Sequence, residues 1–117
     1  MMMTLLQVAL GGAIGSVLRY MTVAAVGAPL GTLVVNVVGS FVMGVLFVVL
    51  TARAGLSPLL MTGILGGFTT FSAFSLDALK LWQAGQIAPA LAYVGASVIL
   101  SLIAVALGAA LAKGVLA

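Results

Sequence analysis

Charged side chains are rare in this chain, and their positions constrain its fold more than any other feature. The charged residues are Arg19, Arg53, Asp77, Lys80 and Lys113. They make up 4% of 117 residues, whereas ordinary soluble domains are roughly 25% charged. Residues 20–52 and 81–112 carry no charge at all. Because about 20 consecutive apolar residues can form a helix that crosses a bilayer, we predict an all-α protein embedded in lipid.

Three prolines divide the apolar sequence into spans of helical length. Proline is favoured in the first turn of a helix, so Pro29, Pro58 and Pro89 each mark a helix start, and the N-terminus supplies a fourth helix. We therefore predict four transmembrane helices in a single domain, residues 1–117. The loops are short, as expected for antiparallel neighbours. The predicted spans are residues 4–24, 30–51, 57–82 and 88–112.

The composition excludes several classes of function. The chain has no histidine, no cysteine and one carboxylate. The common metal sites, thiol chemistry and catalysis by a Ser-His-Asp triad or paired carboxylates therefore have no residues to use. The basic pI arises from too few charges to form a nucleic-acid-binding patch. The sequence predicts a protein that is not an enzyme and does not bind nucleic acid.

The positive charges are balanced between the two sides of the predicted bundle. Four spans place Arg53 and Lys113 on the side of the termini, and Arg19 and Lys80 on the other side. Orientation follows the Lys/Arg difference between short loops, so a balanced count predicts insertion in both orientations. Alternatively, Arg19 lies too deep to count, and the side of the termini is cytoplasmic. Insertion in both orientations would let two chains pair antiparallel.

Small and polar residues recur at helical spacing in three of the predicted spans. The repeats share one face of each helix, because side chains three or four residues apart are neighbours. Glycine pairs at this spacing predict close helix contacts. The polar repeats either line a polar path or cross-bond the helices, and three of them together favour a path. The repeats are Gly11, Gly15 and Arg19; Thr32, Asn36, Ser40 and Gly44; and Tyr93, Ser97 and Ser101, with further glycine pairs Gly27–Gly31 and Gly63–Gly67.

The densest polar segment is GGFTTFSAFS at residues 66–75. Two glycines followed by two β-branched threonines form helix poorly, so we predict that the third helix is broken at the membrane midplane. Backbone carbonyls freed there must face protein, water or an ion, and such carbonyls commonly bind cations in discontinuous helices. Phe71 and Phe74 share a face of the following helix; a lone phenylalanine there would normally contact core or lipid.

The polar groups inside the spans suit an anion. The net charge is +3, no carboxylate lies at the centre of a predicted span, and the side chains offer hydroxyl and amide donors. Proton-coupled cation transport normally needs a buried acid. Aromatic edges are weakly positive, so Phe71 and Phe74 could also contact an anion. A small hydrated anion needs several short hydrogen bonds in place of its water.

Three motifs resemble the Fluc/CrcB fluoride channels: GGAIGSVLRY at 11–20, GTLVVNVVGSFVMG at 31–44 and GGFTTFSAFS at 66–75. The resemblance covers nearly the whole chain. It implies a homodimer of oppositely oriented subunits with two pores, through which fluoride leaves the cell passively. It also implies the inner membrane of a prokaryote as the location, and defence against fluoride toxicity as the role.

The resemblance further implies roles for individual residues. The carbonyls of Gly66 and Thr69 would bind a central structural Na⁺ where the two subunits cross, and Arg19 would line a vestibule. The remaining candidates would form the anion pathway: Thr32, Asn36, Ser40, Phe71, Phe74, Tyr93, Ser97 and Ser101.

The main alternative is a small four-helix multidrug or cation exporter that also inserts in both orientations. Such a protein would share the length, the glycine packing and the charge balance. It should carry an acidic residue at the membrane centre of its first helix, and residues 4–24 contain none.

Overall fold

The computed structural model describes the backbone of residues 1–117 and every side chain except those of Ala52 and Ala54. Among these residues, four helices are long and apolar enough to cross a membrane, which confirms the predicted number. They run at Met2–Val26 (α1), Leu30–Val49 (α2), Pro58–Gln83 and Ile87–Leu116 (α5). The first and last helices extend beyond the predicted 4–24 and 88–112, because no proline interrupts their flanking residues, and Lys113 suits the last turn of a helix.

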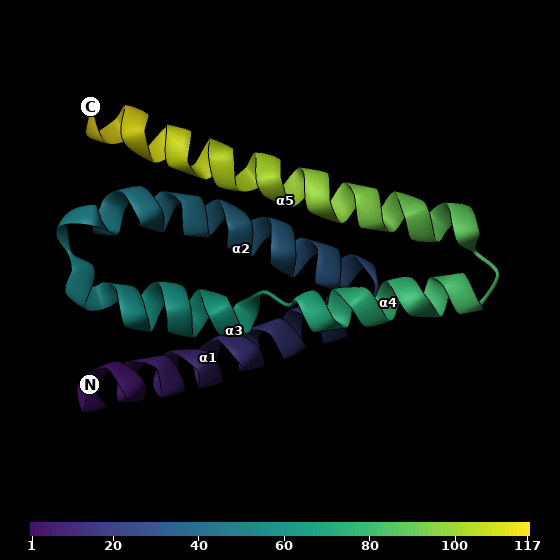
Figure 1. Ribbon diagram of the computed structural model, residues 1–117, viewed down its shortest axis with the longest axis horizontal. Coiled ribbons are helices and arrows are strands. Elements are labelled where there is room, and N and C mark those ends of the chain that lie inside the picture. Colours follow the sequence, from purple (N-terminus) through teal and green to yellow (C-terminus); the bar gives the residue numbers. More distant parts are fainter.

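The four long helices alternate in direction (Figure 1). Both termini lie at one end, with the 3₁₀ turns Leu50–Ala52 and Ala54–Leu56. The two turns at the other end contain Gly27 and Gly85, with φ of +91° and +79°. Residues with a Cβ atom rarely adopt such positive φ angles, so glycine is favoured at both positions. Gly27 and Gly31 were predicted to let helices approach closely, and for Gly27 this was wrong: it ends α1, and an added methyl there would meet no described atom within 4 Å.

The third long span consists of several segments. A π-helical segment, Pro58–Leu65 (η3), continues into the short α3 (Gly66–Phe68), and α4 (Phe71–Gln83) completes the span. Between α3 and α4, Thr69 and Thr70 have extended backbone angles, with ψ of 156° and 124°. We call these two residues the Thr-Thr segment. Thr70 begins α4 as its N-cap, because its Oγ1 accepts a hydrogen bond from the Ala73 N–H at 3.1 Å.

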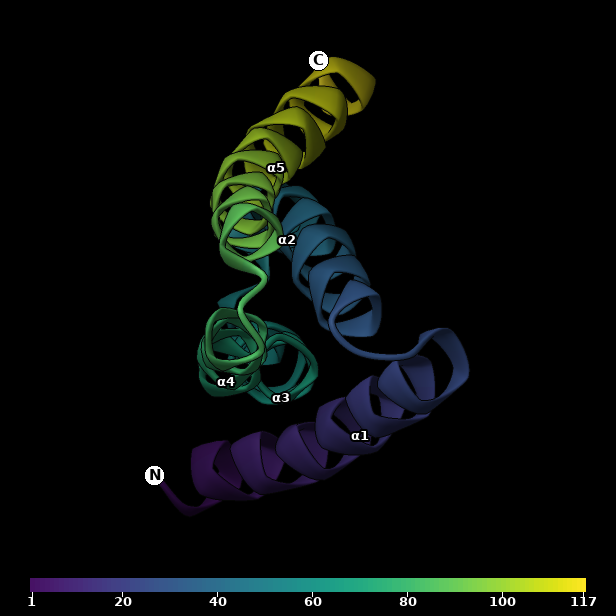
Figure 2. The same ribbon diagram turned by 90° about the vertical axis from the view of Figure 1, so that its right-hand side faces the viewer.

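Glycines bring the helices close together, as the spacing of Gly11, Gly15 and Gly44 predicted. A methyl group added at Gly44 would collide with the backbone of α5, and one added at Gly108 would collide with the Phe41 carbonyl oxygen of α2. Gly11 and Gly15 lie equally close to the backbone of η3. Figure 2 shows the result, with α2 against α5, and α1 crossing beneath α3 and α4. Contacts between small residues permit such close approach in lipid.

Candidate functional site

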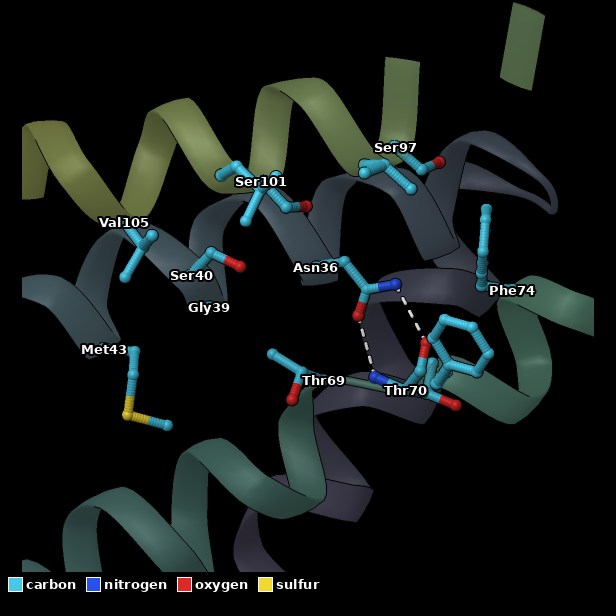
Figure 3. Close-up of a pocket in the computed structure, with 13 residues that line it drawn as sticks. Asn36, Gly39, Ser40, Met43, Thr69, Thr70, Phe74, Ser97, Ser101 and Val105 are labelled. Carbon is cyan, nitrogen blue, oxygen red and sulfur yellow. Dashed lines mark hydrogen bonds between the residues drawn. The ribbon is translucent and has the colours of Figure 1, made fainter. Parts of the chain in front are cut away.

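A groove of about 390 Å³ lies between α2, α5 and the start of α4 (Figure 3). Seven of the predicted site residues line it: Asn36, Ser40, Thr69, Phe71, Phe74, Ser97 and Ser101. Its wall also includes Gly39, Met43, Thr70, Val98, Leu102 and Val105, which were not predicted. The predicted residues Arg19, Thr32, Gly66 and Tyr93 lie outside this lining. The structure therefore gathers the polar residues of α2 and α5 beside the Thr-Thr segment, but not every candidate.

Asn36 pairs with the backbone of Thr70 at the floor of the groove. Its Nδ2 donates to the Thr70 carbonyl at 2.9 Å, and its Oδ1 accepts from the Thr70 N–H at 2.7 Å (Figure 3). The side-chain amide thus supplies hydrogen bonds that an extended residue cannot obtain from a regular helix. The primary contact of Asn36 is with the backbone, so its pairing links α2 to the Thr-Thr segment.

Hydrogen bonds of Asn36 and of the Thr70 hydroxyl divert donors from both predicted cation ligands. In a continuous helix, the Gly66 carbonyl would accept from the Thr70 N–H, four residues later. Here Asn36 takes that N–H. Likewise the Ala73 N–H, which would serve the Thr69 carbonyl, donates to the Thr70 hydroxyl. The carbonyls of Gly66 and Thr69 have therefore both lost their regular helical donors, as a carbonyl that binds an ion requires.

Arg19 forms a hydrogen bond with the carbonyl of Gly67, which lies between Gly66 and Thr69 in the sequence. Its Nε donates to the Gly67 carbonyl at 3.0 Å, across 48 residues of sequence. The Gly67 and Thr70 carbonyls are thus engaged by side chains from α1 and α2. The family resemblance implied a vestibule role for Arg19, and its backbone partner could not be predicted without knowing which helix packs on α1.

Two serines of α5 that line the groove have hydroxyl groups without a hydrogen-bond partner in the described part of the chain. The Oγ atoms of Ser97 and Ser101 are buried and have no hydrogen-bond partner among the described residues. Serine in a helix commonly bonds the carbonyl of its own preceding turn, and a buried hydroxyl without a partner is unfavourable. Both serines line the groove, although their Oγ atoms are covered by neighbouring atoms.

Two phenylalanines lie where α4 meets the groove. Phe71 is 77% exposed and Phe74 is buried. Their ring centroids are 5.4 Å apart at an interplanar angle of 63°, so the contact is edge to face. Phe74 also lies 5.4 Å from the ring of Tyr93 on α5. The exposed ring of Phe71 leaves an aromatic surface at the open side of the groove.

Thr32 and Tyr93 belong to a separate cluster around Asp77. Both hydroxyls donate to Oδ2 of this carboxyl group, Thr32 at 2.7 Å and Tyr93 at 3.2 Å. Asp77 is only 8% exposed. Sequence reasoning missed this cluster, although Asp77 follows Phe74 by three residues and therefore shares its helix face. The cluster cross-bonds α2, α4 and α5 behind Phe74.

Removing the Thr32 hydroxyl tests this cross-bonding. Thr32→Val is expected to destabilise the protein by about 1–3 kcal/mol, because a buried acceptor loses its shorter hydrogen bond. Unfolding in detergent measures the change. Thr22→Val is the matched control, since the Thr22 hydroxyl bonds only the Leu18 carbonyl of its own helix among the described partners. Equal stability of the two variants would contradict a structural role for the cluster.

Comparison with known proteins places the chain in a family. A family model described as "CrcB-like protein, Camphor Resistance (CrcB)" matches residues 6–109. This chain belongs to the CrcB family. Together with its four apolar helices, CrcB membership makes it a multi-pass membrane protein.

Relatives from several bacteria resemble this CrcB chain over almost its full length. A Cereibacter sphaeroides protein is 55% identical over 123 residues, covering 97% of this chain and 98% of the relative. A Paracoccus denitrificans protein is 54% identical over 121 residues, with the same coverage. A Ruegeria protein is 52% identical and covers 99% of both chains. Each of these relatives is named fluoride-specific ion channel FluC.

Proposed function

We propose that this protein is a fluoride-selective passive channel that exports fluoride from the cytoplasm. The observation that carries the proposal is the identity of 52–55% to fluoride-specific channels, over nearly the whole of each chain. Bacterial relatives also support the inner membrane of a prokaryote as the location. In such a cell the channel relieves toxicity from fluoride that enters as HF and ionises inside.

The groove supplies what a dehydrated fluoride ion needs. Ser97 and Ser101 offer unpaired hydroxyls, and Ser40 lines the same wall. Short hydrogen bonds from these donors can replace hydration water, as in other selectivity filters. The edge of Phe71, or of Phe74, adds a weakly positive surface. A negative cell interior drives anions outward, so the mechanism needs no energy-coupling machinery.

A structural Na⁺ is part of the proposal. The carbonyls of Gly66 and Thr69 fit this ion, because their regular helical donors are diverted to Asn36 and Thr70, and a hard cation prefers oxygen ligands. The extended angles of the Thr-Thr segment support a helix broken at the midplane of the membrane. When bound, Na⁺ would supply positive charge to these carbonyls, and it would take no part in fluoride transfer itself.

We further propose that two oppositely inserted copies form the channel. The open side of the groove and the 77% exposure of Phe71 support a second copy as the missing wall. The charge balance supports insertion in both orientations. Tags on both termini in intact cells should be accessible from both sides of the membrane. A single orientation for all copies would contradict the antiparallel dimer.

Reconstitution into liposomes tests the function. The purified protein is reconstituted into vesicles that contain potassium fluoride or potassium chloride. A potassium ionophore then starts the efflux, and an ion-selective electrode measures the released anion. We expect rapid efflux of fluoride and none of chloride. Proton-coupled efflux of an organic cation without fluoride efflux would establish the exporter alternative instead.

Phe71 provides a direct test of the aromatic surface. Phe71→Ile keeps an apolar side chain but removes the positive ring edge, so fluoride efflux should fall by about tenfold or more. Phe47→Ile is the matched control, because Phe47 is 63% exposed on α2 and lies outside the groove lining. Unchanged efflux in Phe71→Ile would remove this residue from the proposed pathway.

A further inference from the structure

The side chain of Arg19 reaches the backbone at the point where α3 approaches the Thr-Thr segment. Its Nε donates to the Gly67 carbonyl at 3.0 Å, in a part-buried position. Gly67 follows one proposed Na⁺ ligand, Gly66, and precedes the other, Thr69, by two residues. A guanidinium group offers several donors in a rigid planar arrangement, so it fixes direction as well as charge.

A second observation shows that α1 supports the same glycine by direct packing. A methyl group added at Gly67 would lie 2.7 Å from the Gly12 carbonyl oxygen and 3.1 Å from the Ser16 nitrogen. Gly12, Ser16 and Arg19 are spaced by four and three residues, so they lie on one face of α1. This face therefore holds Gly67 both by close backbone approach and by a hydrogen bond to its carbonyl.

The carbonyls around the Thr-Thr segment divide into two kinds. Those of Gly67 and Thr70 accept from the side chains of Arg19 and Asn36. Those of Gly66 and Thr69 have had their regular helical donors diverted. Since carbonyl direction follows from the backbone angles, anchoring one carbonyl also fixes the directions of its neighbours.

We propose that Arg19 is a positioning residue for the cation site. By holding the Gly67 carbonyl against α1, it keeps that oxygen out of the coordination shell and directs the Gly66 and Thr69 carbonyls toward the bound Na⁺. The inference rests on the Na⁺ site of the proposed function. It differs from a vestibule role, in which Arg19 acts on the anion through its charge alone.

Sodium-dependent stability separates the two roles. Thermal unfolding of the full-length protein in detergent is followed while NaCl replaces N-methylglucamine chloride at constant ionic strength. Arg19→Gln removes charge and hydrogen bond, whereas Arg19→Lys keeps the charge but not the planar donor. Both should need about tenfold more Na⁺, or more, for half-maximal stabilisation. Lys80→Gln, the matched control, removes an exposed charge and should titrate like the wild type.

If Arg19→Lys needed the same Na⁺ concentration as the wild type for half-maximal stabilisation, the inference would be overturned. The positive charge alone would then be enough to maintain the cation site. If neither Arg19 variant folds, Gly67→Ala decides, since its methyl pushes Gly67 away from α1 while Arg19 keeps its charge. A shifted midpoint in Gly67→Ala supports the positioning role, and a wild-type midpoint overturns it. A wild-type protein that does not respond to Na⁺ also overturns it. Fluoride efflux from wild-type proteoliposomes tests the channel function independently of these results.

Discussion

Asn36→Leu is expected to reduce fluoride efflux by about a hundredfold or more, the largest functional effect of any substitution in the groove. Leucine is close to asparagine in size but offers no hydrogen bond. The N–H and carbonyl of Thr70 then lose the partners that they have at 2.7 and 2.9 Å. An unpaired backbone group costs about 1–3 kcal/mol when it is fully buried, and the Thr70 groups are part-buried. The Thr-Thr segment should therefore rearrange, and with it the floor of the groove.

Efflux from proteoliposomes and thermal unfolding in detergent together measure the effect. Asn36→Asp is the informative companion variant, because it keeps an acceptor for the Thr70 N–H and loses the donor to the Thr70 carbonyl. It should fall between the wild type and Asn36→Leu in stability. Wild-type efflux in Asn36→Leu would show that the pairing with Thr70 is dispensable.

Gly108→Ala is expected to cause a large loss of stability. The added methyl would collide with the Phe41 carbonyl oxygen, and it would lie 3.2 Å from the Val45 nitrogen. These are backbone atoms, which cannot turn aside as a side chain can, so α2 and α5 must separate. Overpacking of this kind typically costs about 1–3 kcal/mol, and sometimes more. A lower unfolding temperature in detergent and loss of monodisperse protein would show it.

Gly95→Ala on the same helix is the matched control. At Gly95 an added methyl would meet no described atom within 4 Å. Alanine favours helix over glycine by about 1 kcal/mol, so this variant should be neutral or more stable. The two substitutions are chemically identical and differ only in what faces them. If both changed stability by the same amount, the close approach of α2 and α5 at Gly108 would be disproved.

The long helices could be predicted because they depend on local properties of the sequence. Apolar length, proline position and the scarcity of charge each act within a single span, and together they predicted four helices. The i,i+4 spacing also identified Gly11 and Gly15 as contact residues, since a helix face is a local property. It failed at Gly27, where the same spacing coincides with a turn that needs positive φ.

The hydrogen-bond partners could not be predicted, because they join segments far apart in the chain. Asn36 and Thr70 are 34 residues apart, and Thr32 and Asp77 are 45 apart. Their spacing places Thr32 and Asn36 on one helix face, which favours a common path. The structure gives them different partners, because α4 continues past the groove and brings Asp77 to one of them only. The roles of the groove residues in conduction remain predictions.

The position of the termini limits how two copies of this protein can be fused into one polypeptide. With both ends of the chain at one end of the bundle, the last residue of one copy and the first residue of an oppositely inserted copy lie on opposite faces of the bilayer. A flexible tether of any length cannot connect them. A single polypeptide containing both halves requires an additional hydrophobic segment of about 20 residues between them. A tandem gene without that segment would force both halves into the same orientation.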